Sequence, residues 1–166
     1  MEIIVRPPQT LSWKTTKVRC AIGRGGVSAD KMEGDGATPI GTFPLRRVLY
    51  RADRLEPPQS GLAVRALGAD DGWCDEPTNA FYNRPVRLPF PAGHEVLWRD
   101  DNVYDVIVEL GYNDDPVRPD LGSAIFMHVA RPGYDPTEGC VALALEDLLD
   151  LLRHCDDQTV LSVTSP

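Results

Sequence analysis

Residues 125–152 read IFMHVARPGYDPTEGCVALALEDLLDLL, and the remaining sequence is interpreted around this segment. It opens as an apolar strand that ends near His128, continues through a loop of Pro, Gly and Asp, and returns at the Gly139-Cys140 pair. A thiol and an imidazole therefore lie twelve positions apart, joined by a loop that can fold one back on the other. A cysteine that attacks a carbonyl at neutral pH needs a base nearby, because the thiolate is the nucleophile.

Short β-prone runs dominate the chain and predict a mainly β fold. They carry Val, Ile, Tyr and Phe between Gly, Pro and Asp, at Glu2–Arg6, Lys17–Ile22, Thr42–Tyr50, Val103–Leu110, Ala124–Ala130 and Thr159–Val163. One principal helix follows the cysteine, roughly from Leu145 to Cys155, with leucines at i, i+3, i+4 and i+7. Its first turn is acidic and its last turn holds Arg153 and His154, which suits the helix dipole.

Two long connections, residues 23–41 and 67–101, show little periodicity. Connections of this length usually serve a site or are disordered. The first is rich in glycine, which allows a phosphate-binding interpretation, but it matches neither the P-loop pattern nor the dinucleotide fingerprint. We expect a flexible hairpin or a lid over a cleft instead.

Length and charge restrict the class of protein. The 166 residues fit a single domain, residues 1–166, and the formal charge of −8 argues against a nucleic-acid partner. The opening MEIIVRPPQT lacks a basic segment followed by a long apolar stretch, so we expect a cytoplasmic protein; a periplasmic location would require a leader missing from this sequence. No run of about 18 apolar residues predicts a membrane span. Nothing in the pattern indicates the oligomeric state.

Four cysteines are present, at positions 20, 74, 140 and 155, without a C-x-x-C pair or a disulfide framework. In a reducing cytosol all four would be free thiols. His94-Glu95 lacks the second histidine of a zinc-binding helix, and Cys74 has no partner at ligand spacing. We therefore expect neither a metal nor a cofactor.

From the residues alone, Cys140 is the candidate nucleophile and His128 the candidate base, which later protonates the leaving amine. Gly139 has no side chain, so a substrate carbonyl can approach, and the amides of Gly139 and Cys140 are candidate oxyanion donors. The alternative is a core histidine beside an inert buried thiol. The spacing alone does not separate the two interpretations.

Two segments resemble the YkuD-like L,D-transpeptidases. Residues 126–128 (FMH) followed by 137–140 (TEGC) are similar to that family's His…[Ser/Thr]-His-Gly-Cys signature, and residues 33–43 (EGDGATPIGTF) are similar to its G-x-[Thr]-Pro-x-Gly-x-[Phe/Tyr] segment. The resemblance implies a β-sandwich-like or mixed-sheet fold, with Cys140 as nucleophile and His128 as general base. It also implies peptidoglycan stem peptides or muropeptides as partners, cleaved between an L-centre and a terminal D-Ala.

The sequence departs from this pattern in the lining of the site. Glu138 stands where the family has histidine before the glycine, Ala142 stands where Arg or Asn is common, and the loop between His128 and Cys140 is shorter than in many members. A carboxylate beside the thiolate would raise the cysteine's pKa. We therefore expect Glu138 to point elsewhere or to pair with a cation such as Arg131.

Four further residues are candidates for substrate binding. The terminal D-Ala bears a carboxylate, which the planar fork of an arginine suits, and Arg131, Arg84 and Arg24 are the candidates. Tyr112 follows the Val103–Leu110 strand and is expected to line the cleft.

These features favour a cytosolic L,D-carboxypeptidase that acts in cell-wall recycling, with water as acyl acceptor. One alternative is a periplasmic L,D-transpeptidase that cross-links peptidoglycan. The other is a catalytically silent domain that binds cell-wall peptides, which the departures at Glu138 and Ala142 keep open.

Overall fold

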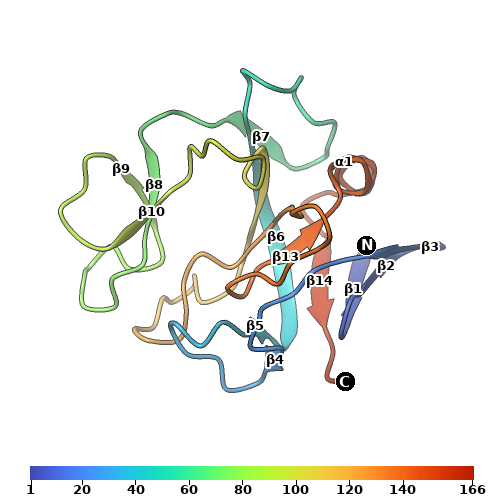
Figure 1. Cartoon of the computed structure of the whole chain (residues 1–166), viewed down its shortest axis with the longest axis horizontal. Coiled ribbons are helices and arrows are strands. Elements are labelled where there is room, and N and C mark those ends of the chain that lie inside the picture. Colours follow the sequence, from blue (N-terminus) through green and yellow to red (C-terminus); the bar gives the residue numbers. More distant parts are fainter.

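A nine-stranded mixed sheet organises the computed structural model, which describes all residues from Met1 to Pro166 (Figure 1). The strands follow the order β13-β12-β11-β6-β14-β1-β2-β3, with β7 also paired to β6. Their bounds are β1 (Glu2–Arg6), β2 (Thr10–Trp13), β3 (Thr16–Arg19), β6 (Gly41–Tyr50), β7 (Ala63–Ala66), β11 (Val106–Leu110), β12 (Phe126–Val129), β13 (Val141–Leu143) and β14 (Val160–Val163). The mainly β fold class expected from the sequence is confirmed.

Strand β6 is long enough to pair with three other strands. Along one edge it pairs with β11, and along the other it pairs with β14 near its start and with β7 near its end. The parallel pair β12–β13 extends the sheet beyond β11. Every residue of β11, β12 and β13 is buried, as expected for strands covered on both faces.

Alternating side chains divide the core between the two faces of the sheet. On one face, Val108 and Met127 belong to a large apolar cluster that includes the helix α1 (Leu145–Leu152). On the other, Ile107 and Phe126 pack in a smaller cluster that also contains Cys140. The nucleophile candidate is therefore on the face opposite to α1.

The helix begins where the leucine pattern predicted and ends three residues earlier. Leu148, Leu151 and Leu152 are fully buried. The predicted end at Cys155 is wrong because the backbone tightens after Leu152: the amides of the next residues bond carbonyls three positions back. Arg153 is the C-cap, so the basic pair follows the last turn. This helix, with eight residues, is far too short to cross a membrane.

Residues 67–101 form a second, three-stranded sheet with the order β10-β8-β9, seen on the left of Figure 1. Its strands are β8 (Asp71–Cys74), β9 (Pro85–Arg87) and β10 (His94–Val96). Trp73 of β8 packs edge-on against Phe126, with ring centroids 5.0 Å apart. This contact brings the small sheet onto the face of the main sheet that carries Cys140.

Candidate active site

The parallel pair β12–β13 places His128 and Cys140 on one face of the sheet. In its register His128 is opposite Ala142, and Cys140 precedes Ala142 by two residues, so their side chains project to the same side. Both line a single cleft of about 270 Å³. The sequence therefore brings the thiol and the imidazole together, as the loop between them predicted.

The thiol of Cys140 lies at the buried end of this cleft. Its Sγ donates to the carbonyl oxygen of Ala124 at 3.2 Å and accepts from the amide of Phe126 at 3.3 Å. Burial raises the pKa of Cys140 to about 12, and the nearby charge of Glu95 adds to that rise. At neutral pH the resting site therefore holds a protonated thiol.

The imidazole of His128 is held in one tautomer. Its Nδ1 lies 2.9 Å from the carbonyl oxygen of Val129, which can only accept, so Nδ1 carries the proton. Nε2 has no hydrogen-bond partner in the chain and is not fully buried. Burial, with a smaller contribution from the charges of Arg99 and Arg131, lowers the pKa of His128 to about 4. The neutral ring thus has an unprotonated Nε2 available to accept the thiol proton.

The turn before the nucleophile is tied by Thr137. Its hydroxyl donates to the carbonyl oxygen of Cys140 at 2.6 Å and accepts from the amide of Gly139 at 3.1 Å. The Gly139 amide is thus already bonded, whereas the Cys140 amide makes no hydrogen bond within the chain. Of the two candidate oxyanion donors, only the amide of Cys140 is free in this structure.

Gly139 is required by its backbone and by its neighbour. Its φ is +135°, and a Cβ atom there would lie 2.8 Å from the carbonyl oxygen of Ala37. Ala37 belongs to the glycine-rich connection, so that segment packs directly against the turn that presents Cys140. A side chain at position 139 would push the two segments apart.

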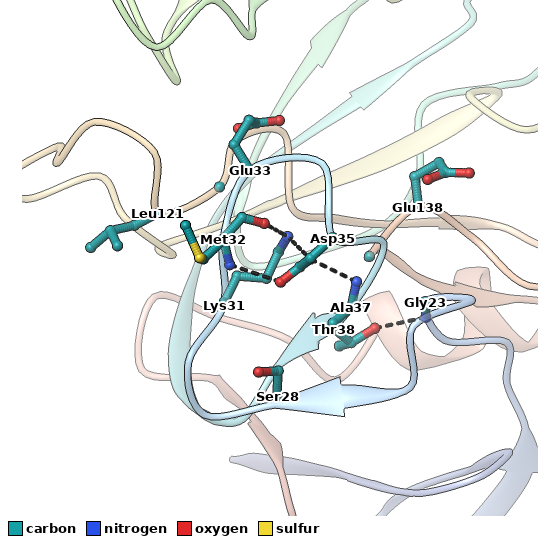
Figure 2. Close-up of polar contacts among 12 residues, drawn as sticks. Gly23, Ser28, Lys31, Met32, Glu33, Asp35, Ala37, Thr38, Leu121 and Glu138 are labelled. Carbon is teal, nitrogen blue, oxygen red and sulfur yellow. Dashed lines mark hydrogen bonds and ion pairs between the residues drawn. The ribbon is translucent and has the colours of Figure 1, made fainter.

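The connection 23–41 packs against the turn through Ala37, and Figure 2 shows the polar contacts inside this connection. It contains the short strands β4 (Val27–Ser28) and β5 (Thr38–Pro39), and the Gly23 amide donates to the Thr38 hydroxyl at 2.8 Å. Lys31 and Asp35 pair inside it at 2.6 Å. None of its residues lines the catalytic cleft. The segment is therefore a support for the turn, and the expected lid over the cleft is not seen.

Glu138 lies at the rim of the cleft and pairs with Arg24. The Arg24 Nε is 2.9 Å from each carboxylate oxygen of Glu138, and both side chains are exposed. The expected pairing with a cation is present, but the partner is Arg24, whereas Arg131 pairs with Asp101 at 3.3 Å. The reason is that the connection 23–41 runs beside residue 137, with which Arg24 shares a backbone hydrogen bond.

Two arginines line the cleft on the side of His128. Arg131 was a candidate from the sequence, and Arg99, on the 67–101 connection, joins it in the cleft lining. Asp101 binds both, with Arg99 Nη2 at 2.7 Å and Arg131 Nη1 at 3.3 Å. The hydrogen bond from Arg99, together with the charges of both arginines, lowers the pKa of Asp101 to about 2. One carboxylate thus holds two guanidinium groups, so their fork-shaped donors at this wall suit an anion, although the same cleft also carries the carboxylates of Glu95 and Asp135.

The remaining candidates lie elsewhere. Arg84 and Tyr112 line a separate hollow of about 210 Å³, and Tyr112 packs edge-on against Phe43. Their roles in substrate binding stay predictions.

No sequence pattern assigned Glu95, Arg99 or Tyr104 to this site, yet all three line the cleft. The first two lie on the aperiodic 67–101 connection. The Tyr104 ring meets His128 edge-on at 5.3 Å, so it fixes one side of the imidazole.

A mainly β scaffold presents a buried cysteine, a histidine with a free Nε2 and two arginines in one cleft, and these are groups that cysteine-dependent enzymes use. The family model of the L,D-transpeptidase catalytic domain, YkuD, matches residues 2–163. The chain belongs to this family of cysteine-based enzymes that act on peptidoglycan. No curated protein and no solved structure matches the chain.

Proposed function

We propose that the chain is a cysteine acyl enzyme that hydrolyses the bond between an L-centre and the terminal D-Ala of peptidoglycan stem tetrapeptides. One observation carries this proposal: Cys140 and the unprotonated Nε2 of His128 open into the same cleft as Arg131. Family membership supports a peptidoglycan peptide as the substrate.

Acylation begins from the neutral pair. The proton of Sγ moves to Nε2 of His128 as Sγ attacks the scissile carbonyl carbon, so that no thiolate–imidazolium pair, which burial disfavours, has to form before the attack. The developing oxyanion meets the free amide of Cys140. The C–N bond then breaks, Nε2 returns the proton to the departing amine of D-Ala, and a thioester remains on Cys140.

Deacylation reverses the proton path. A water gives its proton to Nε2 and attacks the thioester, and Sγ leaves and recovers that proton. The arginine pair at the cleft wall suits the carboxylate of the D-Ala leaving group. This arrangement favours substrates whose scissile residue is the C-terminal one.

The size of the cleft supports water as the acceptor. Its volume of about 270 Å³ is at the low end for sites that hold a drug-sized ligand. Two of its lining residues are held in ion pairs, Glu138 with Arg24 and Arg131 with Asp101. One peptide end and a water fit there more readily than two peptide stems. Action on cytosolic muropeptides stays part of the proposal, to be tested by cell fractionation.

The test is a product assay with purified tetrapeptide muropeptides and mass spectrometry. We expect tripeptide and free D-Ala, and the C140A variant should release neither. Cross-linked dimers as the main product would replace the carboxypeptidase with an L,D-transpeptidase. Absence of any turnover would remove the enzymatic proposal.

The second candidate is a silent domain that binds cell-wall peptides. One observation favours it: the pKa of Cys140 is raised to about 12, like those of Cys20 and Cys155, which are buried structural thiols. Labelling with a peptide-like electrophile separates the candidates. An enzyme should be labelled selectively at Cys140, and a silent domain should show no preference over Cys20, Cys74 and Cys155.

A further inference from the structure

Glu95 is a carboxylate in the catalytic cleft that has no cation partner. Its only side-chain hydrogen bond comes from the hydroxyl of Tyr104, which donates to Oε2 at 2.8 Å. The three fully buried carboxylates of this protein each have an arginine within 3.0 Å, whereas the half-buried Glu95 has none: the pairs are Glu109 with Arg47, Asp71 with Arg65, and Asp105 with Arg54. Within the chain, the charge of the half-buried Glu95 therefore has no ion-pair partner, and Tyr104 is its only hydrogen-bond donor.

The surroundings place this carboxylate beside the reacting groups. Glu95 lines the same cleft as Cys140 and His128, and its hydrogen-bond donor, Tyr104, packs its ring edge against the imidazole. A second, more open hollow of about 500 Å³ also reaches Glu95. A ligand group can therefore approach the carboxylate from solvent without displacing a packed side chain.

The guanidinium of Arg99, in the wall of the same cleft, already binds another carboxylate. Arg99 donates through Nε and Nη2 to Asp101, at 2.8 and 2.7 Å, in a two-point pair. Burial raises the pKa of Glu95 despite the charge of Arg99, and the charge of Glu95 in turn raises the pKa of Cys140. A cation brought by the substrate would offset both effects.

We propose that Glu95 is a specificity-determining residue that binds an ammonium group on the residue whose carbonyl is attacked. A compact ammonium fits this position, because Oε1 accepts no hydrogen bond within the chain and an ammonium is a point charge that needs only one acceptor oxygen. This inference rests on the proposed function for its peptide substrate, and it adds a preference of the cleft for a positively charged side chain.

Binding of that ammonium also prepares the nucleophile. In the free protein the carboxylate opposes ionisation of the neighbouring thiol, and pairing with a cation removes this opposition. Burial is the larger cause of the raised pKa of Cys140, so pairing of Glu95 with a cation relieves that rise only in part.

The test measures binding, so that it does not depend on turnover. The C140A protein is titrated by calorimetry with two stem tetrapeptides that differ in the third residue, L-lysine or Nε-acetyl-L-lysine. We expect the lysine peptide to bind roughly tenfold more tightly or better, as for a hydrogen bond between charged groups. The E95Q/C140A protein should bind both peptides equally, with the lysine peptide weakened.

The matched control is E138Q/C140A, since Glu138 lines the same cleft but already pairs with Arg24. It should keep the preference for lysine. Equal affinity for the two peptides in C140A, or a preference that survives E95Q, overturns the inference. Failure of the product assay with the binding preference intact would remove only the proposed function. Failure to bind either peptide overturns the inference as well.

A second measurement follows the thiol and needs no peptide. Alkylation of Cys140 by neutral iodoacetamide at pH 7.5 should be several-fold faster in E95Q than in the wild type, because the carboxylate no longer opposes the thiolate. An unchanged rate, in a protein whose circular dichroism matches the wild type, contradicts the proposed restraint on Cys140.

Discussion

Lowering the pH from 7 to 5 should destabilise the native chain through His128. Burial lowers its pKa from 6.5 to about 4, so across this interval the unfolded chain binds a proton that the native chain does not. Stability from this group is therefore constant above about pH 6.5, falls as pH falls, and levels off below the native pKa. The two pKa values give a loss of about 2 kcal/mol between pH 7 and pH 5, and about 3 kcal/mol in full.

The assay compares urea unfolding of the wild type and H128N at pH 7, 6 and 5. Asparagine does not titrate, and its amide can still donate to the Val129 carbonyl that Nδ1 now reaches. The carboxylates titrate in both proteins, so the difference between them isolates His128. We expect the wild type to lose about 2 kcal/mol more than H128N between pH 7 and 5. Parallel losses would mean that the native imidazole is already protonated or solvated, and the neutral-pair mechanism would be refuted.

Three further substitutions test the turn and its rim. G139A places a Cβ 2.8 Å from the Ala37 carbonyl oxygen at a φ of +135°, so urea unfolding should show a loss of about 2 kcal/mol or more; wild-type stability would contradict this packing. T137V removes the hydroxyl that bonds the Gly139 amide and the Cys140 carbonyl. We expect the free energy of unfolding to fall by about 1–2 kcal/mol and the alkylation of Cys140 to become slower. An unchanged alkylation rate would show that the turn keeps its conformation without this hydroxyl. R24A leaves Glu138 unpaired at the rim. The melting temperature should stay the same because the pair is exposed, whereas the ratio of the alkylation rate of Cys140 by iodoacetate to that by iodoacetamide should fall, because the unpaired carboxylate repels the anionic reagent. A constant ratio would exclude an electrostatic role for this pair.

Much of the main sheet could be predicted because its strands carry strong local patterns. The run Glu2–Arg6 is a strand over its full predicted length, and Thr42–Tyr50 lies within β6. The three-stranded sheet of 67–101 could not be predicted in the same way. Its strands have three or four residues among glycines and prolines, and contacts distant in sequence, such as Trp73 with Phe126, hold them in place.

The candidate site likewise has a part that could be predicted from local sequence and a part that depends on contacts distant in sequence. The thiol and imidazole lie on adjacent strands joined by a short loop, so their proximity follows from local sequence. The ion pair of Arg24 with Glu138 joins residues 114 positions apart, and the placement of Glu95 depends on a sheet with no sequence pattern. Charges brought together by tertiary structure leave no periodic signal in the chain.

The place of β14 in the main sheet affects how this protein is made. It comes after every other strand along the chain, yet it lies between β6 and β1 and pairs with both. As the polypeptide leaves the ribosome, the hairpins of β1, β2 and β3 therefore keep one unsatisfied edge until Val163 has emerged. A nascent chain stalled before that point would expose the unpaired backbone N–H and C=O groups of β1, and chaperones bind exposed strand edges of this kind.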